Sequence, residues 1–134
     1  MSTTDRLDIS ELFSRLSHLL DDEHPDDIDT VYTEDVVVHS PRGGELRGRD
    51  AVATYLRQAR VVTEKTVHVN GDILITLDGD EAQASANQLV YFYRDGEPPH
   101  QTSALRTTYT AVRTPAGWRF RAARLTLAWT QPKQ

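Results

Sequence analysis

The change of hydrophobic period near residue 64 is the feature that most limits how this chain can fold. Before it, apolar residues recur at helical spacing, whereas after it the chain consists of long strand-like runs separated by turn residues. The four runs are KTVHVNGDILITL, AQASANQLVYFYR, TSALRTTYTAVR and WRFRAARLTLAWT. Helices followed by a meander of antiparallel strands predict an α+β fold, in which the helices cover one face of a strongly curved sheet. We expect the uncovered part of that face to form a pocket.

Three helices are expected before this change of period. The first covers residues 8–20, where apolar side chains form one stripe, and Asp8 resembles the start of a capping box. Pro25 interrupts that helix and favours a short second helix over residues 26–32. The third covers residues 50–60. Its buried face is expected to comprise Ala51, Val52, Tyr55, Leu56 and Ala59.

The segment between the second and third helices is expected to hold one strand and one loop. Val36, Val37 and Val38 form a β-branched run, which favours a strand. The sequence PRGGELRG that follows is rich in turn residues and is expected to be a loop.

Length and composition predict one domain over residues 1–134 and narrow the classes of function. The net charge of −5 argues against nucleic acid as a partner, because phosphate binding requires clustered Lys and Arg. No apolar run approaches the roughly 20 residues that span a bilayer, so no membrane partner is expected. The first ten residues, MSTTDRLDIS, contain no apolar signal region, which favours a cytoplasmic protein.

The absence of cysteine excludes disulfides, thiolate nucleophiles and cysteine-ligated metals. His39, His68 and His100 are not spaced as a metal-binding pair with a supporting carboxylate, so we expect no metal site. PRGGELRG lacks the spacing of a phosphate-binding loop. Any chemistry is therefore expected to come from His, Asp, Glu, Tyr or Arg side chains or from a bound cofactor.

The order of the segments resembles that of the SnoaL-like family, within the nuclear transport factor 2-like superfamily, over residues 8–130. The resemblance is carried by VYTEDVVVHS, by GRDAVATYL, by TVHVNGDILITLDGDEA and by the closing GWRFRAARLTLAW. It implies a cone-shaped, curved antiparallel sheet packed by three N-terminal helices, also called cystatin-like. The family includes polyketide cyclases, scytalone dehydratase, ketosteroid isomerase, limonene epoxide hydrolase and non-catalytic modules, so the fold alone does not give the function.

The scytalone dehydratase-like branch is the most similar one, and it implies an acid–base site. There an Asp on the first helix and His residues on the sheet share a bound water. His68 matches the first sheet His by its place in TVHVN, and Asp21 or Asp22 matches the helix Asp. The second His has no match, since Tyr91 or Tyr93 stands near its place.

The residues themselves point to the same cluster. A strand His among apolar neighbours can titrate near neutrality, although His68 is equally readable as a core histidine held by a hydrogen bond. Asp21 and Asp22 close the first helix, where the helix dipole would raise the pKa of an inward carboxyl group; otherwise both are solvated. Gln88 shares the parity of the inward-facing residues of its strand and is expected to be a polar group in the pocket.

Aromatic residues and one further histidine are candidates for binding the substrate. We expect them to line the pocket wall or its mouth, although buried aromatic residues are more often plain core. These candidates are Tyr55, Tyr109, Trp118, Trp129 and His39.

Two functions from different classes follow. The first is a cofactor-free acid–base enzyme, a cyclase, dehydratase (lyase) or isomerase of a biosynthetic kind, acting on a small cyclic or polyketide-like compound. The second is a non-catalytic ligand-binding or dimerisation module, which predicts a closed core. The apolar residues Leu89, Tyr91 and Tyr93 on the other face of their strand favour a homodimer formed through the sheet.

Overall fold

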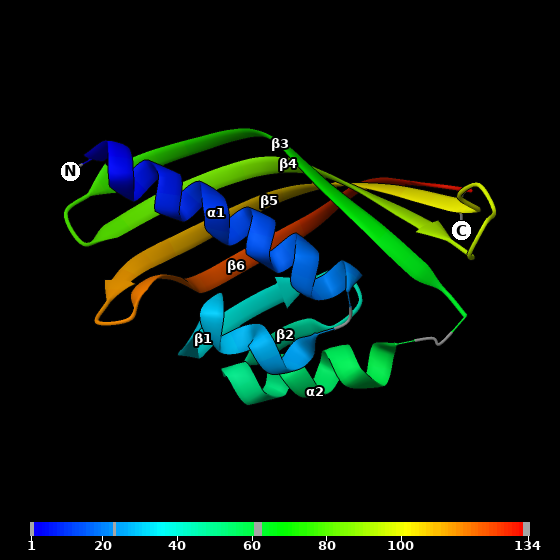
Figure 1. The fold of residues 1–134 in the computed structure, drawn as a ribbon, viewed down its shortest axis with the longest axis horizontal. Helices are drawn as coiled ribbons and strands as arrows, with labels where there is room; N and C mark the ends of the chain where they lie inside the picture. The colour runs from blue at the N-terminus through cyan, green and yellow to red at the C-terminus, as the bar shows by residue number, and fades with distance from the viewer. Residues whose placement is uncertain (1, 23, 61–62, 133–134) are drawn as a thin grey trace.

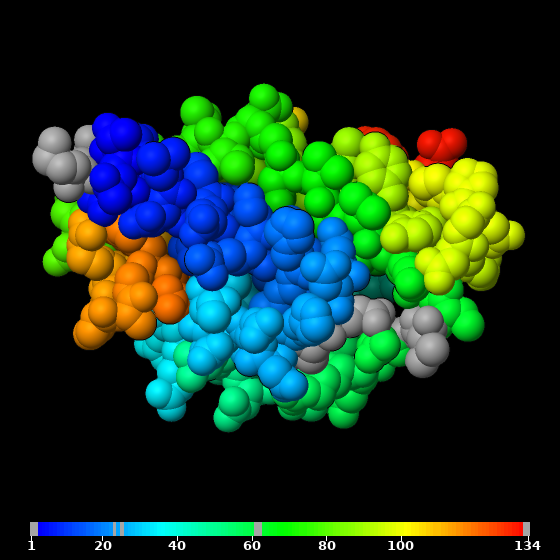
Figure 2. Space-filling view, in the orientation of Figure 1, coloured from blue at the N-terminus to red at the C-terminus, as the bar shows by residue number. Residues whose placement is uncertain are grey.

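The computed structural model describes residues 2–22, 24–60 and 63–132, and it contains one twisted six-stranded sheet with helix α1 lying across one face (Figure 1). The space-filling view shows this face, with α1 passing over the strands (Figure 2). In chain order the elements are α1 (Ser2–Asp21), the 3₁₀ helix η1 (Pro25–Thr30), β1 (Tyr32–Ser40), β2 (Gly44–Arg47), α2 (Arg49–Ala59), β3 (Lys65–Asp78), β4 (Glu81–Tyr93), β5 (Gln101–Thr114) and β6 (Gly117–Gln131).

The strands follow the order β2-β1-β6-β5-β4-β3. The long meander from β3 to β6 is confirmed, and β3 pairs with β4, β4 with β5, and β5 with β6 in antiparallel register. The sheet is nevertheless mixed, because β1 pairs with β6 in parallel. The expectation that PRGGELRG is only a loop is wrong, since Gly44–Arg47 folds back on β1 as strand β2.

The expectation of three N-terminal helices is also wrong, because the described residues contain two α-helices and one six-residue 3₁₀ helix. The tighter helix is closed by Asp27 N–H donating to the His24 carbonyl and by Val31 N–H donating to the Ile28 carbonyl. The chain must turn directly into β1 at Tyr32, which leaves no length for further α-helical turns.

Helix α1 begins earlier than the capping pattern at Asp8 predicts. Its first residue is Ser2, and Asp5 in the first turn reaches the β5–β6 hairpin. This tertiary contact stabilises a turn that the local pattern does not require.

The core lies between the middle of α1 and the inner face of the sheet. The ring of Phe13 packs edge-on against Tyr109 and Phe120, with centroid distances of 5.0 and 5.2 Å. Small side chains on β4, such as Ala84 and Ala86, allow the helix to approach. Truncating a buried ring such as Phe13 to Ala is expected to cost about 3–5 kcal/mol of stability. This packing fixes α1 on the sheet, and the last turn of the helix lies against β3.

Candidate active site

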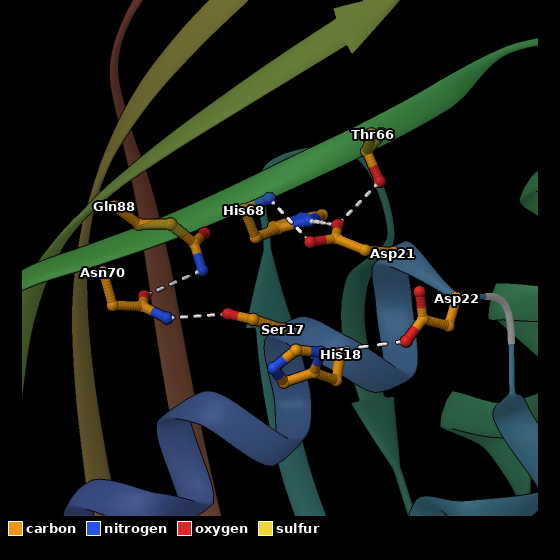
Figure 3. Close-up of polar contacts among 8 residues, drawn as sticks. All are labelled: Ser17, His18, Asp21, Asp22, Thr66, His68, Asn70 and Gln88. Carbon is orange, nitrogen blue, oxygen red and sulfur yellow. Dashed lines mark hydrogen bonds and ion pairs between the residues drawn. The ribbon is translucent and has the colours of Figure 1, made fainter. Parts of the chain in front are cut away.

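The last turn of α1 meets β3 through a carboxylate and an imidazole (Figure 3). The Nδ1 atom of His68 lies 2.6 Å from Oδ1 of Asp21, and the backbone N–H of His68 donates to Oδ2 at 2.9 Å. The Thr66 hydroxyl donates to Oδ1 at 3.0 Å. The Asp21 carboxylate therefore holds His68 through both its ring and its backbone N–H.

Simple periodicity explains why these groups meet. Thr66, His68 and Asn70 alternate along β3 and so lie on one face of the strand. Ser17 and Asp21 are four residues apart on α1 and so lie on one face of the helix. The two faces lie against each other, and Asn70 donates through Nδ2 to the Ser17 hydroxyl at 2.8 Å.

Gln88 extends this polar network onto β4 (Figure 3). Its Nε2 donates to Oδ1 of Asn70 at 3.2 Å, and its side chain is buried as the parity of the strand predicts. An amide nitrogen carries two hydrogens, so one remains for a ligand.

Burial raises the pKa of Asp21, but the hydrogen bonds from the side chain and backbone of His68, together with that from Thr66, lower it more, so the pKa lies below its usual value. The expected rise of the pKa at the helix end is wrong for this residue, because the hydrogen-bond donors on β3 lower the pKa more than burial raises it. The ionised carboxylate only accepts hydrogen bonds, so Nδ1 of His68 carries a hydrogen, and in the neutral form of the ring Nε2 presents a lone pair. Among the described residues nothing hydrogen-bonds to Nε2.

Asp22, the other candidate, does not join the site. Its carboxylate lies 3.7 Å from Nδ1 of His18, and both side chains are largely exposed. Asp21 and His68, by contrast, have side chains that are only 19% and 13% exposed. The structure therefore brings Asp21 to the histidine and leaves Asp22 in solvent.

A cavity of about 670 Å³ lies beside this pair, in the size range of small-molecule sites. His68 lines it, whereas Asp21 stands behind the imidazole and outside the lining. The expectation of a pocket on the inner sheet face is confirmed. Its wall is mainly apolar, as in Leu16, Leu19, Val52, Leu56, Phe92 and Leu125.

Three of the proposed binding residues line the cavity: Gln88, Tyr55 and Tyr109. Tyr32, from the start of β1, joins them. Burial raises the pKa of Tyr109 and of Tyr32, so both phenols stay neutral at ordinary pH and can donate a hydrogen bond.

The other three proposed binding residues lie elsewhere. His39 contacts Glu45 at 3.4 Å and faces away from the cavity, because its neighbours Val38 and Ser40 line the cavity. Trp118 is buried in the core and donates from Nε1 to Asp5. Trp129 is 47% exposed and alternates with the lining residue Thr130, so it lies on the outer sheet face.

A family model of the SnoaL-like domain matches residues 1–124. The chain belongs to the SnoaL-like family. No curated protein matches it.

Solved structures with the same fold include several proteins from the wider superfamily. A putative scytalone dehydratase from Novosphingobium aromaticivorans is 22% identical, with a TM-score of 0.87 over 99% of this chain and 90% of that one. An NTF2-like protein with a cystatin-like fold from the same organism is 27% identical, with a TM-score of 0.80 over 94% and 83%. A hexachlorocyclohexane dehydrochlorinase is 15% identical, with a TM-score of 0.84 over 99% and 91%.

In this SnoaL-like protein, sequence reasoning missed the hydroxyl groups on the far wall of the cavity. Ser103 and Thr130 line it together with Gln101. The parity that identified Gln88 would have identified Ser103, because the adjacent strand alternates in the same way. Residues 2–22, 24–60 and 63–132 contain no group of three potential metal ligands. None of their helices is long and apolar enough to cross a bilayer.

Proposed function

We propose that this protein is a cofactor-free acid–base enzyme, a cyclase, dehydratase or isomerase, that acts on a small cyclic or polyketide-like compound in the cavity. The observation that supports it most is the 2.6 Å contact between Asp21 and Nδ1 of His68, with the imidazole in the wall of a mainly apolar cavity. A histidine held in one tautomer and facing a ligand-sized space is suited to proton transfer.

The proposed reaction begins with removal of a proton from a carbon next to a carbonyl group by Nε2 of His68. The pair of electrons from that C–H bond moves onto the carbonyl oxygen as an enolate, and the Asp21 carboxylate stabilises the imidazolium that forms. Gln88 and Tyr109 would donate hydrogen bonds to the enolate oxygen. The imidazolium then returns its proton to another carbon in an isomerisation, or to a leaving hydroxyl group in a dehydration.

Proton exchange tests this proposal without knowledge of the natural substrate. The probe is 2-tetralone in deuterium oxide, and loss of the proton signal at its C1 position is followed by NMR. The wild type should accelerate exchange over buffer, and His68→Gln should lower that acceleration at least a hundredfold, which is the usual contribution of general acid–base catalysis. Asp8→Asn, which changes an exposed residue of α1 outside the site, is the control and should exchange as the wild type does. Equal acceleration by the wild type and His68→Gln would remove the role of the imidazole.

The second candidate is a non-catalytic ligand-binding module. It is favoured by the internal partners of the polar residues, since Gln88 is bound to Asn70 and His68 to Asp21. The cavity contradicts the closed core expected for such a module, although it leaves room for ligand binding without catalysis. Binding of 2-tetralone with no exchange above the buffer rate would support the module.

We also propose that a second copy of this chain packs on the outer sheet face. One row of the register crosses four strands through Val69, Leu89, Ala104 and Trp129, and both Val69 and Trp129 are 47% exposed. An apolar row of this length suits a symmetric interface. Trp129→Glu should convert a dimer into a monomer by light scattering after gel filtration, whereas Leu74→Glu, outside this row, should not. A monomeric wild type at high concentration would contradict the proposal.

A further inference from the structure

A row of the inner sheet face joins His68 to a second polar spot. The register pairs His68 with Val90, Val90 with Ser103 and Ser103 with Thr130, across β3, β4, β5 and β6. All four residues line the cavity. Ser103 thus lies two strands away from His68, a separation of about 10 Å along the sheet.

The hydrogen bonds at this spot determine what Ser103 offers to a ligand. The Thr130 hydroxyl is shared by three groups: it accepts from Nε2 of Gln101 at 3.2 Å, donates to the Thr102 carbonyl at 3.5 Å, and lies 2.9 Å from the Ser103 hydroxyl. A hydroxyl has one hydrogen and two lone pairs. All three contacts are satisfied together only when Ser103 donates to Thr130. Ser103 then retains lone pairs alone and acts as an acceptor.

The surroundings make this acceptor selective. Leu105, Leu127 and Phe92 line the cavity around it, and Ser103 itself is only 7% exposed. An acceptor in an apolar wall is poorly served by water, so a ligand group that donates to it gains more than it would at the surface.

We propose that the group formed by Ser103, Thr130 and Gln101 is a binding subsite for a hydroxyl group of the substrate, at the end remote from the proton that His68 transfers. This inference rests on the proposed function, since it assigns the substrate of the same cavity. The separation of about 10 Å between the two sites selects a molecule of two or more fused rings that carries a hydroxyl on the ring farther from the reacting carbon.

A pair of probes that differ by one hydroxyl tests the subsite. They are 2-tetralone and 6-hydroxy-2-tetralone, and their dissociation constants are measured by NMR titration while exchange at C1 is measured separately. Wild-type protein should bind the hydroxylated probe roughly three- to tenfold more tightly, as one net hydrogen bond provides. Ser103→Ala should bring the ratio of the two dissociation constants to about one, because the hydroxylated probe loses its hydrogen-bond partner. Ser103→Thr should restore it.

Thr108→Val is the control, because it removes a hydroxyl of the same strand whose side chain is exposed on the other sheet face and lies outside the cavity lining. It should leave the ratio as in the wild type, and circular dichroism of each variant checks the fold. Equal affinities of the wild type for the two probes, a ratio unaffected by Ser103→Ala, or binding of neither probe would overturn the subsite. Discrimination between the probes without any exchange would keep the subsite and reject the proposed chemistry, while exchange without discrimination would do the reverse.

Discussion

Each end of α1 is joined to the sheet by a carboxylate that accepts three hydrogen bonds, but the two contacts differ in what they can do. Near its start, Asp5 accepts two hydrogen bonds from Arg113 at 2.9 Å and a third from Nε1 of Trp118 at 3.1 Å. At its end, Asp21 accepts two from His68 and one from Thr66. In both places one carboxylate fixes the helix to the sheet through three donors.

The two contacts differ in the side chain that meets the carboxylate and in whether that side chain lines the cavity. Arg113 stays charged, since its hydrogen bonds to Asp5 and Asp80 raise its pKa further, and its guanidinium lies 4.8 Å from the Trp118 ring centre. None of Asp5, Arg113 and Trp118 lines the cavity. The imidazole of His68 can gain and lose a proton, and it does line the cavity. The contact between helix and sheet at Asp21 is therefore a candidate active site, because its partner is titratable and lines the cavity, whereas the contact at Asp5 is structural.

The largest effect that separates the two ends is expected from Asp21→Asn. The amide cannot hold the imidazole in the tautomer that exposes the Nε2 lone pair, and it provides no charge to stabilise the imidazolium. The kcat of proton exchange should fall about a hundredfold, with a much smaller change in KM, because the carboxylate does not touch the ligand. NMR exchange kinetics measure both constants.

Asp22→Asn provides the matched control for this prediction. The two residues are adjacent, yet Asp22 meets only the exposed His18, so its replacement should change kcat less than twofold. Equal losses in the two variants would mean that the charge of the helix end, and not the contact with His68, supports the activity.

The pattern of the sequence predicted the sheet far better than it predicted the site. Period-two alternation placed the four long strands and pointed Gln88 inward, because burial on one face imposes that pattern directly. It did not choose between Asp21 and Asp22, since one residue on a helix turns the side chain by about 100° and tertiary contacts decide where the helix lies. The assignment of Trp129 to the pocket failed because a register shift between Leu127 and Trp129 moves Trp129 off the face that Leu125 and Leu127 share, and the sequence pattern does not reveal such a bulge.

A smaller effect, on stability and lost in acid, is expected at the other end of the helix. Hydrogen bonds from Arg113 and Trp118 lower the pKa of Asp5 from 3.8 to about 2. A carboxyl group whose pKa is lowered by folding stabilises the protein above its unfolded pKa, and this contribution is lost as the pH falls through the folded pKa. Asp5→Asn should therefore lower the Tm by a few degrees at neutral pH, and the deficit should shrink between pH 4 and pH 2. Thermal unfolding followed by circular dichroism across this pH range measures the Tm, and the exposed Asp8→Asn should follow the wild type. Because Asp5 lies away from the cavity, exchange activity at neutral pH should stay within twofold of the wild type, and a larger loss would mean that the two ends of α1 are coupled.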